Sequence, residues 1–492
     1  MRLKVKFLKW SAGIPVAMLR KKTAEKIGVH AQDRIIIMIN GKQKFTTILD
    51  TVESGLLKEN EIAVTSEIAS ILNLRKSQIV DIQLSSMPKS VEFIKKKLNN
   101  HSLSKKEIHI IIEDIVSNCL SEAEIALFIV AMDKAGMTIK EIAHLIEAIL
   151  ETGSKLNLKN KYLVDKHSIG GIAGNRTTPI VVSICASAGL MIPKSSSRAI
   201  TTAAGTADVI ETIARVDFSM KELKKIVKKT KGCMIWGGGL GMVPADSKII
   251  HVEKQLSIDP ESQLIASIMA KKLAVGSKYI VIDIPYGSSA KVTKQKALQL
   301  KRKFEEIGKY FKKKMRVVLT DGDQPMGMGV GPALELKDVM AVLNPQQQGP
   351  EDLEDKSTFL AGILLEMTKK AEKQKGQNLA KKILSSGKAF EKFKEIIKAQ
   401  KGTFKEIREA KFNKTIFSKK RGKVIKINNK RINALARTAG CPKDKFAGLK
   451  IYVSLKDKIK KGDKLLTIYA ETKSRLNEAL KFYKQMKPIS IK

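Results

Sequence analysis

The sequence alternates short apolar runs with longer amphipathic stretches from Tyr162 onward, and this alternation limits the possible folds more than any other feature. The runs that look like buried elements are Ile180–Ala188, Lys278–Ile284 and Arg316–Thr320. Longer segments with helical periodicity, such as Glu261–Leu273 and Thr293–Gly308, lie among them. Strands that alternate with helices are typical of α/β folds, so we expect a central α/β domain over residues 161–345.

The first 85 residues have a different pattern, which predicts a small β-rich, barrel-like domain over residues 1–85. Asn40-Gly41 is a hairpin signal, because both residues tolerate the positive φ angles of a tight turn. Short helices are expected around Thr23–Ile27 and Ser66–Leu72. The segments rich in apolar and β-branched residues are Val5–Phe7, Arg34–Ile39, Lys44–Leu49 and Ile79–Leu84.

Residues 86–160 are predicted to form a helical domain. Ser121 and Glu124 have the spacing of a capping box, in which the hydroxyl accepts a backbone N–H and the glutamate reaches back to the cap. Thr138 and Glu141 have the same spacing, and apolar residues follow them at helical intervals. We expect residues 247–275 to join this domain in space.

Residues 346–492 are predicted to form a C-terminal α+β domain. A helical stretch rich in Lys and Glu covers Ser357–Gln400, and short strands with turn signals follow it. A chain of 492 residues is too long for one small core. The sequence therefore predicts a multidomain α/β protein.

The formal net charge of +42 attracts anions, and nucleic acid is one candidate partner. However, aromatic residues make up only 5% of the chain, which leaves few platforms for base stacking. The lysines are spread along the whole sequence, a pattern that favours a solvated surface over a specific nucleic-acid interface. No apolar run is long enough to span a membrane.

The cysteine and histidine residues predict no disulfide framework and no metal site. The cysteines are scattered without paired spacing, which indicates a reducing, cytoplasmic environment. The six histidines also lack paired spacing, so we expect no metal and no cofactor.

Two segments have the composition of anion-binding loops. Asp165–Gly171 places Lys166, Ser168 and Gly171 at the end of a strand-like run. The lysine supplies a cation and the serine a donor, while glycine lets backbone N–H groups approach an anion closely. A phosphate cradle and a tight structural turn both fit this segment.

The second segment, Ser195–Asp208, places six hydroxyl side chains around Arg198 before a helix begins. An arginine with hydroxyl groups can bind a second anion through a bidentate contact. The alternative is a polar loop that ends in a helix cap. A third, Gly-rich segment, Cys233–Asp246, is not specific by itself.

The combination and order of these segments resemble the signature of the thymidine/pyrimidine nucleoside phosphorylase family. The resemblance is greatest to the branch that contains AMP phosphorylases and type 2 thymidine phosphorylases, which share an extra N-terminal domain similar to Met1–Leu84. It covers nearly the whole chain. The matching segments are Asp165–Ser168, Ser196–Ile200, Ala204–Asp208, Leu264–Ser267, Lys271–Lys272 and Thr320–Gly327.

The resemblance implies a pentosyltransferase that uses inorganic phosphate to release the base from a nucleoside or nucleoside 5′-monophosphate. Asp259 would give a proton to the leaving base, a role that suits a carboxylic acid. A helix N-cap before Pro260 is the structural alternative for Asp259. The implied binding residues are Gly171, Ser197, Arg198, Ala199, Ile200, Thr201, Thr202, Thr206, Ser267 and Lys291, with Lys166 and Ser168 in the phosphate cradle.

The same resemblance implies a helical domain that faces a larger α/β domain across a cleft, and a homodimer or larger assembly. The substrate stays less certain than the reaction. Pyrimidine phosphorylases carry an arginine near the position of Glu253, and a carboxylate cannot donate to a thymine carbonyl. Conversely, Gly174–Thr177 is more similar to the bacterial type 2 proteins. We favour AMP, CMP or UMP as substrate, with thymidine as the alternative.

Two other classes of function stay open at this point. One is a phosphoribosyltransferase of related architecture, which would require a diphosphate substrate and Mg²⁺. The other is a non-catalytic binder of nucleotides or RNA, which would show salt-sensitive binding without turnover.

Overall fold

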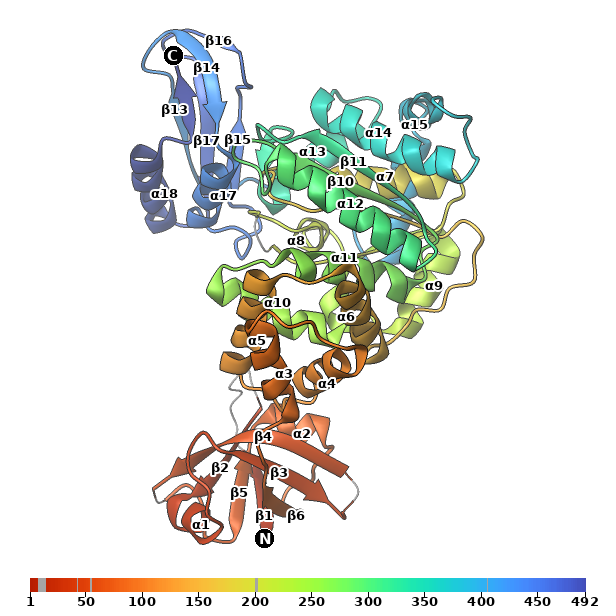
Figure 1. Cartoon of the computed structure of the whole chain (residues 1–492). Helices are drawn as coiled ribbons and strands as arrows, with labels where there is room; N and C mark the ends of the chain where they lie inside the picture. Colours follow the sequence, from red (N-terminus) through yellow and green to blue (C-terminus); the bar gives the residue numbers. More distant parts are fainter. Residues whose placement is uncertain (8–14, 42, 54, 200–201, 405) are drawn as a thin grey trace. The chain divides into compact units, whose positions relative to one another are not determined.

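The computed structural model describes residues 1–7, 15–41, 43–53, 55–199, 202–404 and 406–492. By its internal packing the chain divides into two compact units. The first comprises Met1–Gly153 and Val243–Ser267, and the second comprises Ser154–Met242 and Ile268–Lys492. Figure 1 labels the helices and strands of both units.

The first unit begins with a closed six-stranded barrel (Figure 1), as the β-rich pattern predicts. Asn40 and Gly41 form the turn after β3 with φ angles of 49° and 68°, which confirms the hairpin signal. The strand order is β1-β5-β2-β4-β3-β6. The elements are β1 (Arg2–Phe7), β2 (Val16–Arg20), α1 (Lys21–Lys26), β3 (Arg34–Ile39), β4 (Gln43–Val52), β5 (Glu61–Val64), α2 (Ser66–Ile71) and β6 (Ile79–Leu84).

Helices make up the rest of the first unit. The capping boxes of Ser121 with Glu124 and of Thr138 with Glu141 are both present, as predicted. The helices are α3 (Lys89–Leu98), α4 (Lys105–Val116), α5 (Glu122–Ala135), α6 (Ile139–Glu151), α10 (Pro244–Leu256) and the first part of α11 (Glu261–Val275). Lys248 of α10 donates to the carbonyls of Ile115 and Val116 at the end of α4, at 2.9 and 2.7 Å. A distant segment of sequence thereby becomes part of the helical bundle.

The second unit is built on parallel strands. β11 (Lys314–Asp321), β10 (Tyr279–Tyr286) and β7 (Val164–Ser168) form one sheet in that order, and β8 (Ile192–Ser196) pairs with β9 (Gly232–Trp236) in another. A parallel bridge between Leu163 and Met191 joins the two sheets. The carboxyl ends of all five strands therefore point the same way.

One apolar run whose pattern favours a strand forms a helix instead. Ile180–Ala188 looks like a strand in sequence, but it lies mostly in the helix α7 (Thr177–Ser187). Every residue from Thr177 to Ala186 is buried. A helix buried on all sides shows no amphipathic period, so its sequence cannot be told from that of a buried strand.

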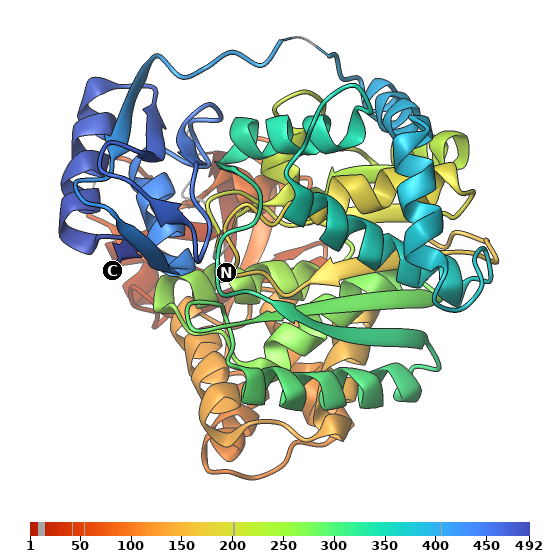
Figure 2. The ribbon, with the colours of Figure 1, turned by 90° about the horizontal axis from the view of Figure 1, so that it is seen from above.

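Helices cover both faces of the parallel sheet, as Figure 2 shows. The helix α12 (Lys294–Tyr310) packs on β10 and β11, while α14 (Glu351–Met367) packs on β10 and α7. The helices α15 (Gly376–Ser385) and α16 (Lys388–Ala399) also contact α7. Residues 351–399 thus share the α/β core, although their sequence was assigned to the C-terminal domain.

The remaining elements of the α/β part are short. They are α8 (Thr206–Ile210), α9 (Met220–Thr230), the 3₁₀ helix η1 (Gly237–Leu240), β12 (Gly329–Val330) and α13 (Pro332–Leu343).

Residues beyond α16 form two small antiparallel sheets with two helices. β12 pairs with β15 (Gly448–Ile451), so a strand of the α/β part extends a C-terminal sheet of order β12-β15-β17-β13. The other sheet has the order β16-β14-β18. The elements are β13 (Phe412–Phe417), β14 (Gly422–Ile427), α17 (Asn429–Thr438), β16 (Lys458–Ile459), β17 (Lys464–Ala470), α18 (Lys473–Met486) and β18 (Ile489–Ile491).

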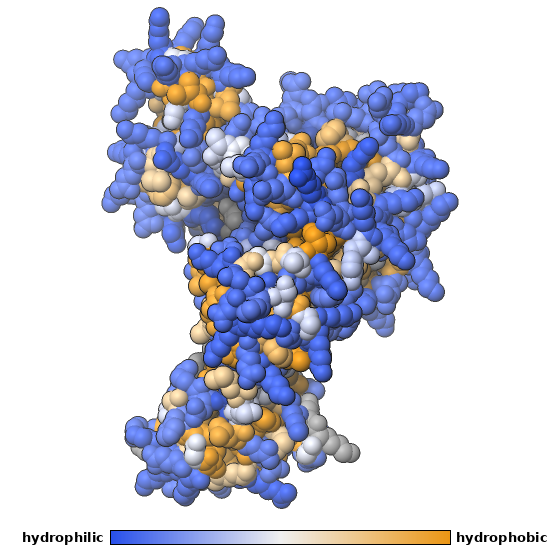
Figure 3. Space-filling model, viewed as in Figure 1, coloured by the Kyte–Doolittle hydropathy of each residue, from blue (hydrophilic) through white to orange (hydrophobic). Residues whose placement is uncertain are grey.

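Hydrophilic side chains spread over many elements of the face in Figure 3, with smaller apolar areas between them. This distribution agrees with lysines that are scattered along the sequence. Within the described residues, we find no helix with the length and apolar content that crossing a bilayer requires.

Candidate active site

The loops that follow the parallel strands gather most of the predicted site residues at one edge of the sheet. Gly170 and Gly171 follow β7, Ser197 and Arg198 follow β8, and Lys291 lies in the turn after β10. In open α/β sheets, ligands bind outside the carboxyl ends of the strands. This edge is therefore the candidate active site of the second unit.

The loop after β7 lies directly against the turn after β10. Gly171 has a φ angle of 93°, and a Cβ atom placed on it would meet the Cβ atom of Lys291 at 2.8 Å and its backbone N at 2.9 Å. Only glycine combines this backbone angle with so close an approach. The structure thus brings two of the predicted residues, Gly171 and Lys291, into contact.

Lys166 and Ser168 are joined by a chain of polar side chains. The Lys166 ammonium donates to the Thr177 hydroxyl at 2.5 Å, and that hydroxyl donates to the Asn175 amide oxygen at 3.4 Å. The Asn175 amide nitrogen in turn donates to the Ser168 hydroxyl at 3.3 Å. Burial lowers the pKa of Lys166 to about 7, so this amine is about half protonated near neutral pH.

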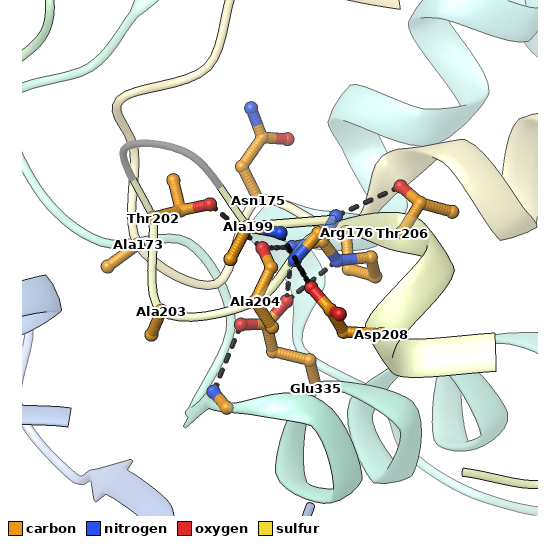
Figure 4. A network of polar contacts seen from close by, with 12 residues as sticks. Ala173, Asn175, Arg176, Ala199, Thr202, Ala203, Ala204, Thr206, Asp208 and Glu335 are labelled. Carbon is orange, nitrogen blue, oxygen red and sulfur yellow. Dashed lines mark hydrogen bonds and ion pairs between the residues drawn. The ribbon is translucent and has the colours of Figure 1, made fainter. Parts of the chain in front are cut away.

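The hydroxyl-rich segment after β8 folds around one carboxylate. Asp208 accepts from the backbone N–H groups of Ala199 and Gly205, each at 2.7 Å. Thr202 donates to the carbonyl of Ala204 at 2.8 Å, as Figure 4 shows. Ser197 is exposed. Two further predicted residues, Ile200 and Thr201, lie outside the described residues.

Arg198 is paired with carboxylates of its own unit. Its guanidinium donates to both carboxylate oxygens of Glu211 at 2.7 Å, approaches Asp208 at 3.4 Å, and lies over the Trp236 ring at 5.0 Å. The hydrogen bonds that Arg198 donates to Glu211 raise the pKa of the guanidinium. An anion that binds Arg198 must therefore share the guanidinium with Glu211 or displace it.

Arg176 is a buried residue to which the sequence analysis assigned no role. Its guanidinium donates to Glu335 at 2.7 Å, to the Thr206 hydroxyl at 3.0 Å and to the Ala204 carbonyl at 2.7 Å. Figure 4 shows this network, in which one side chain joins the loop after β7 to the segment after β8. In the sequence, Arg176 precedes the mostly apolar run that begins at Ile180, but its partners lie far along the chain.

Two buried carboxylates beneath the loops are matched by lysines. Asp165 contacts Lys194 at 3.2 Å and Lys272 at 2.8 Å. Asp283 contacts Lys356 at 3.1 Å and accepts from the Thr320 hydroxyl at 2.6 Å. Burial lowers the pKa of Lys272, while Asp165 opposes that change. These ion pairs hold the lysine side chains in fixed positions beneath the loops.

Asp259 and Ser267 belong to the first compact unit. Asp259 is exposed, and Ser267 is buried within α11. The carbonyl of Pro260 accepts from the Leu264 N–H at 2.9 Å, so Pro260 occupies the N-cap position of α11. Asp259 thus lies one residue before this position, and its role as a helix cap stays a prediction.

Comparison with known proteins assigns the chain to a family. Three family models match it: the helical bundle domain of the glycosyl transferase family over residues 91–153, the α/β domain of that family over residues 160–390, and the pyrimidine nucleoside phosphorylase C-terminal domain over residues 423–490. The chain is 42% identical to an AMP phosphorylase of Pyrococcus furiosus, across 100% of this chain and 98% of the relative. It belongs to the AMP phosphorylase family.

Other relatives agree with this assignment. An AMP phosphorylase of Pyrococcus horikoshii is 44% identical over 100% of this chain and 98% of its own length, and one of Methanocaldococcus jannaschii is 42% identical over 94% and 92%. Membership of the AMP phosphorylase family makes the protein an enzyme, a phosphorolytic pentosyltransferase. The resemblance of the sequence motifs to this family is thus confirmed across the whole chain.

A solved structure supports the fold. The crystal structure of anthranilate phosphoribosyltransferase from Thermus thermophilus matches with a TM-score of 0.53 at 17% identity, over 63% of this chain and 99% of that chain. At this identity the match concerns the fold alone.

Substitution of Gly171 by alanine should displace Lys291 and lower the catalytic activity. The new Cβ atom must displace Lys291, and a misplacement of about 1 Å in a catalytic site can cost about 10²-fold in rate. Gly462 has the same φ angle of 93°, with nothing within 4 Å of an added Cβ, so Gly462→Ala is the matched control for backbone strain. We expect both variants to lower the melting temperature, Gly171→Ala by more because of its steric overlap with Lys291, and only Gly171→Ala to lose about 10²-fold in kcat/KM for phosphate. Equal kcat/KM values in the two variants would contradict the placement of Lys291.

Proposed function

We propose that this protein is a nucleoside 5′-monophosphate phosphorylase that acts on AMP, or on CMP or UMP. The bond between C1′ of the ribose and the base nitrogen breaks, and a new bond forms between C1′ and an oxygen of inorganic phosphate. The leaving base takes up one proton, so the products are the free base and ribose 1,5-bisphosphate. The observation that carries the proposal is the identity of 42–44% to AMP phosphorylases over the full chain.

The chemistry of the loops supports the binding of two anions. The loop after β7 supplies Gly170 and Gly171 with positive φ angles, the amine of Lys166 near them and Lys291 beside them. These groups suit inorganic phosphate, because fixed cations and close backbone N–H groups stabilise an anion without reorganisation. We propose this loop as the site of inorganic phosphate.

A second anion, the 5′-phosphate of the nucleotide, is assigned to the segment after β8. Its hydroxyl groups and Arg198 are donors of the kind that bind a phosphate ester. The guanidinium lies at the edge of the sheet with its side chain 38% exposed, so a ligand can reach it beside Glu211. Thymidine lacks this phosphate, and thymidine phosphorolysis is the second candidate function.

The direct test of the substrate is the release of free base, measured by chromatography, from AMP, CMP, UMP, adenosine and thymidine with and without phosphate. We expect phosphate-dependent release from at least one of the monophosphates and little release from thymidine. Release from thymidine alone would show a deoxynucleoside enzyme and would contradict the proposal. Release that requires no phosphate would contradict phosphorolysis itself.

Arg198→Ala tests the assignment of the 5′-phosphate. A hydrogen bond to a charged group contributes about 1.5–3 kcal/mol, so the variant should lose about 10- to 100-fold in kcat/KM on AMP, with a smaller loss on adenosine. Arg215→Ala is the control, because Arg215 also lies over an aromatic ring, that of Phe218, and pairs with a carboxylate, that of Glu222. Equal losses on AMP and adenosine would rule out a contact between Arg198 and the 5′-phosphate.

We propose Asp259 as the group that protonates the leaving base, on the strength of its match to the family sequence. General acid catalysis contributes about 10²–10⁴-fold in rate, so Asp259→Asn should lower kcat by that amount with little change in the melting temperature. Asp133→Asn changes another exposed aspartate of the same unit and should leave kcat unchanged. A kcat of Asp259→Asn within threefold of the wild type would remove the residue from this role. Assembly as a homodimer and a cytoplasmic location stay predictions.

A further inference from the structure

Two buried asparagines of the C-terminal part lie one helical turn apart on α17. Asn429 is 0% exposed and Asn433 is 3% exposed, and both side chains bond to backbone groups of the α/β part. Residues four apart lie on the same face of a helix, so a single face of α17 presents both amides. Asparagine offers an acceptor and two donors, which suits it to hold loops whose backbone groups lack other partners.

Asn429 connects three loops at the carboxyl edge of the parallel sheet. Its amide oxygen accepts from the Ala173 N–H at 3.1 Å, and its amide nitrogen donates to the Gly322 carbonyl at 2.9 Å. Its own backbone N–H donates to the Ser289 hydroxyl at 3.0 Å. These partners lie in the loops after β7, β11 and β10.

Asn433 holds the segment after β8. Its amide oxygen accepts from the N–H of Ala203 at 2.9 Å, in the hydroxyl-rich segment after β8. Ala173 and Ala203 also belong to the apolar core formed by α17 and the C-terminal strands, with Ile432 and Leu435 of the helix among its members. The amide hydrogen bonds and this apolar core therefore hold the same two loops, the one after β7 and the segment after β8.

Each of these bonds lies close to a residue of the proposed site. Ala173 is two residues from Gly171, Ala203 follows Thr202, and Ser289 is two residues from Lys291. If the bonded backbone shifted, the neighbouring site residues would move with it, because at most one residue lies between them. A buried N–H that loses its acceptor costs about 1–3 kcal/mol, enough to favour another loop conformation.

We propose that Asn429 and Asn433 are positioning residues, through which the C-terminal part sets the geometry of the loop after β7 and that of the segment after β8 separately. The assignment of one ligand to each loop rests on the proposed function, whereas the control of loop geometry does not. Asn429 governs the loop after β7, and Asn433 governs the segment after β8.

Steady-state kinetics of alanine variants test this proposal in the full chain. Asn429→Ala should raise KM for phosphate about tenfold or more, with a smaller effect on KM for the nucleotide. Asn433→Ala should raise KM for the nucleotide with a smaller effect on phosphate. Assays run well below the melting temperature of each variant keep the folded fraction constant.

Asn428→Ala is the matched control. Asn428 is the N-cap of the same helix, and its side chain accepts from the Arg431 N–H at 3.1 Å, within the first turn of that helix. Loss of this cap should cost about 1 kcal/mol in stability and leave both KM values unchanged. The proposal is overturned if Asn429→Ala and Asn433→Ala keep both KM values within twofold of the wild type, or if Asn428→Ala raises them equally.

Hydrogen exchange gives a second readout that does not depend on activity. Asn429→Ala should speed amide exchange in the segment around Ala173, and Asn433→Ala should speed it in the segment around Ala203, each leaving the other segment protected. If the wild type released no base from nucleotides, this result would still support the positioning role. Faster exchange in both segments of both variants would show general loosening and would overturn it.

Discussion

The arrangement of the site depends most on the hydrogen bonds and the ion pair of the buried Arg176 guanidinium. Arg176 stands at the start of α7, where the loop after β7 ends, and it reaches the segment after β8 through Ala204 and Thr206. Glu335 of α13 balances its charge at 2.6 Å, although burial raises the pKa of that carboxyl. Removing one partner of such a buried pair costs about 3–5 kcal/mol, because the other charge is left without compensation.

Around this pair, buried charges and amides hold the loops from two sides. Asp165 and Asp283 fix lysines below the sheet edge, while Asn429 and Asn433 hold the loop backbones from the C-terminal part. A site that binds two anions gains from such rigidity, since donors that are already oriented need no reorganisation when charge develops. The proposed positioning role would let the C-terminal part shape the site without contributing any of the predicted substrate contacts.

Much of the local structure followed from short-range patterns in the sequence. Capping boxes, the Asn40-Gly41 turn and the loops after β7 and β8 depend on residues close in the chain, and they were predicted. β2 and β5 were missed because their short sequences contain Ala, Met, Glu and Arg, which favour helices over strands. Ile180–Ala188 was mistaken because a fully buried helix shows no polar face.

The contacts that position the site were beyond the reach of sequence patterns. Arg176 finds Glu335 159 residues away, and Asn429 finds Ala173 at a separation of 256 residues. Arg198 was expected to be available to an anion, yet it is paired with Glu211 on the next helical turn beyond Asp208. Such pairings depend on the tertiary arrangement of the loops, and single residues in the sequence give no sign of them.

Phosphorus NMR of a reaction mixture of AMP and inorganic phosphate tests the central claim most directly. We expect inorganic phosphate to be consumed in an amount equal to the adenine released, which is measured in parallel by chromatography, while a sugar with two phosphate signals forms. Adenine accompanied by ribose 5-phosphate, with inorganic phosphate unchanged, would mean hydrolysis and would contradict phosphorolysis of a nucleotide by this protein.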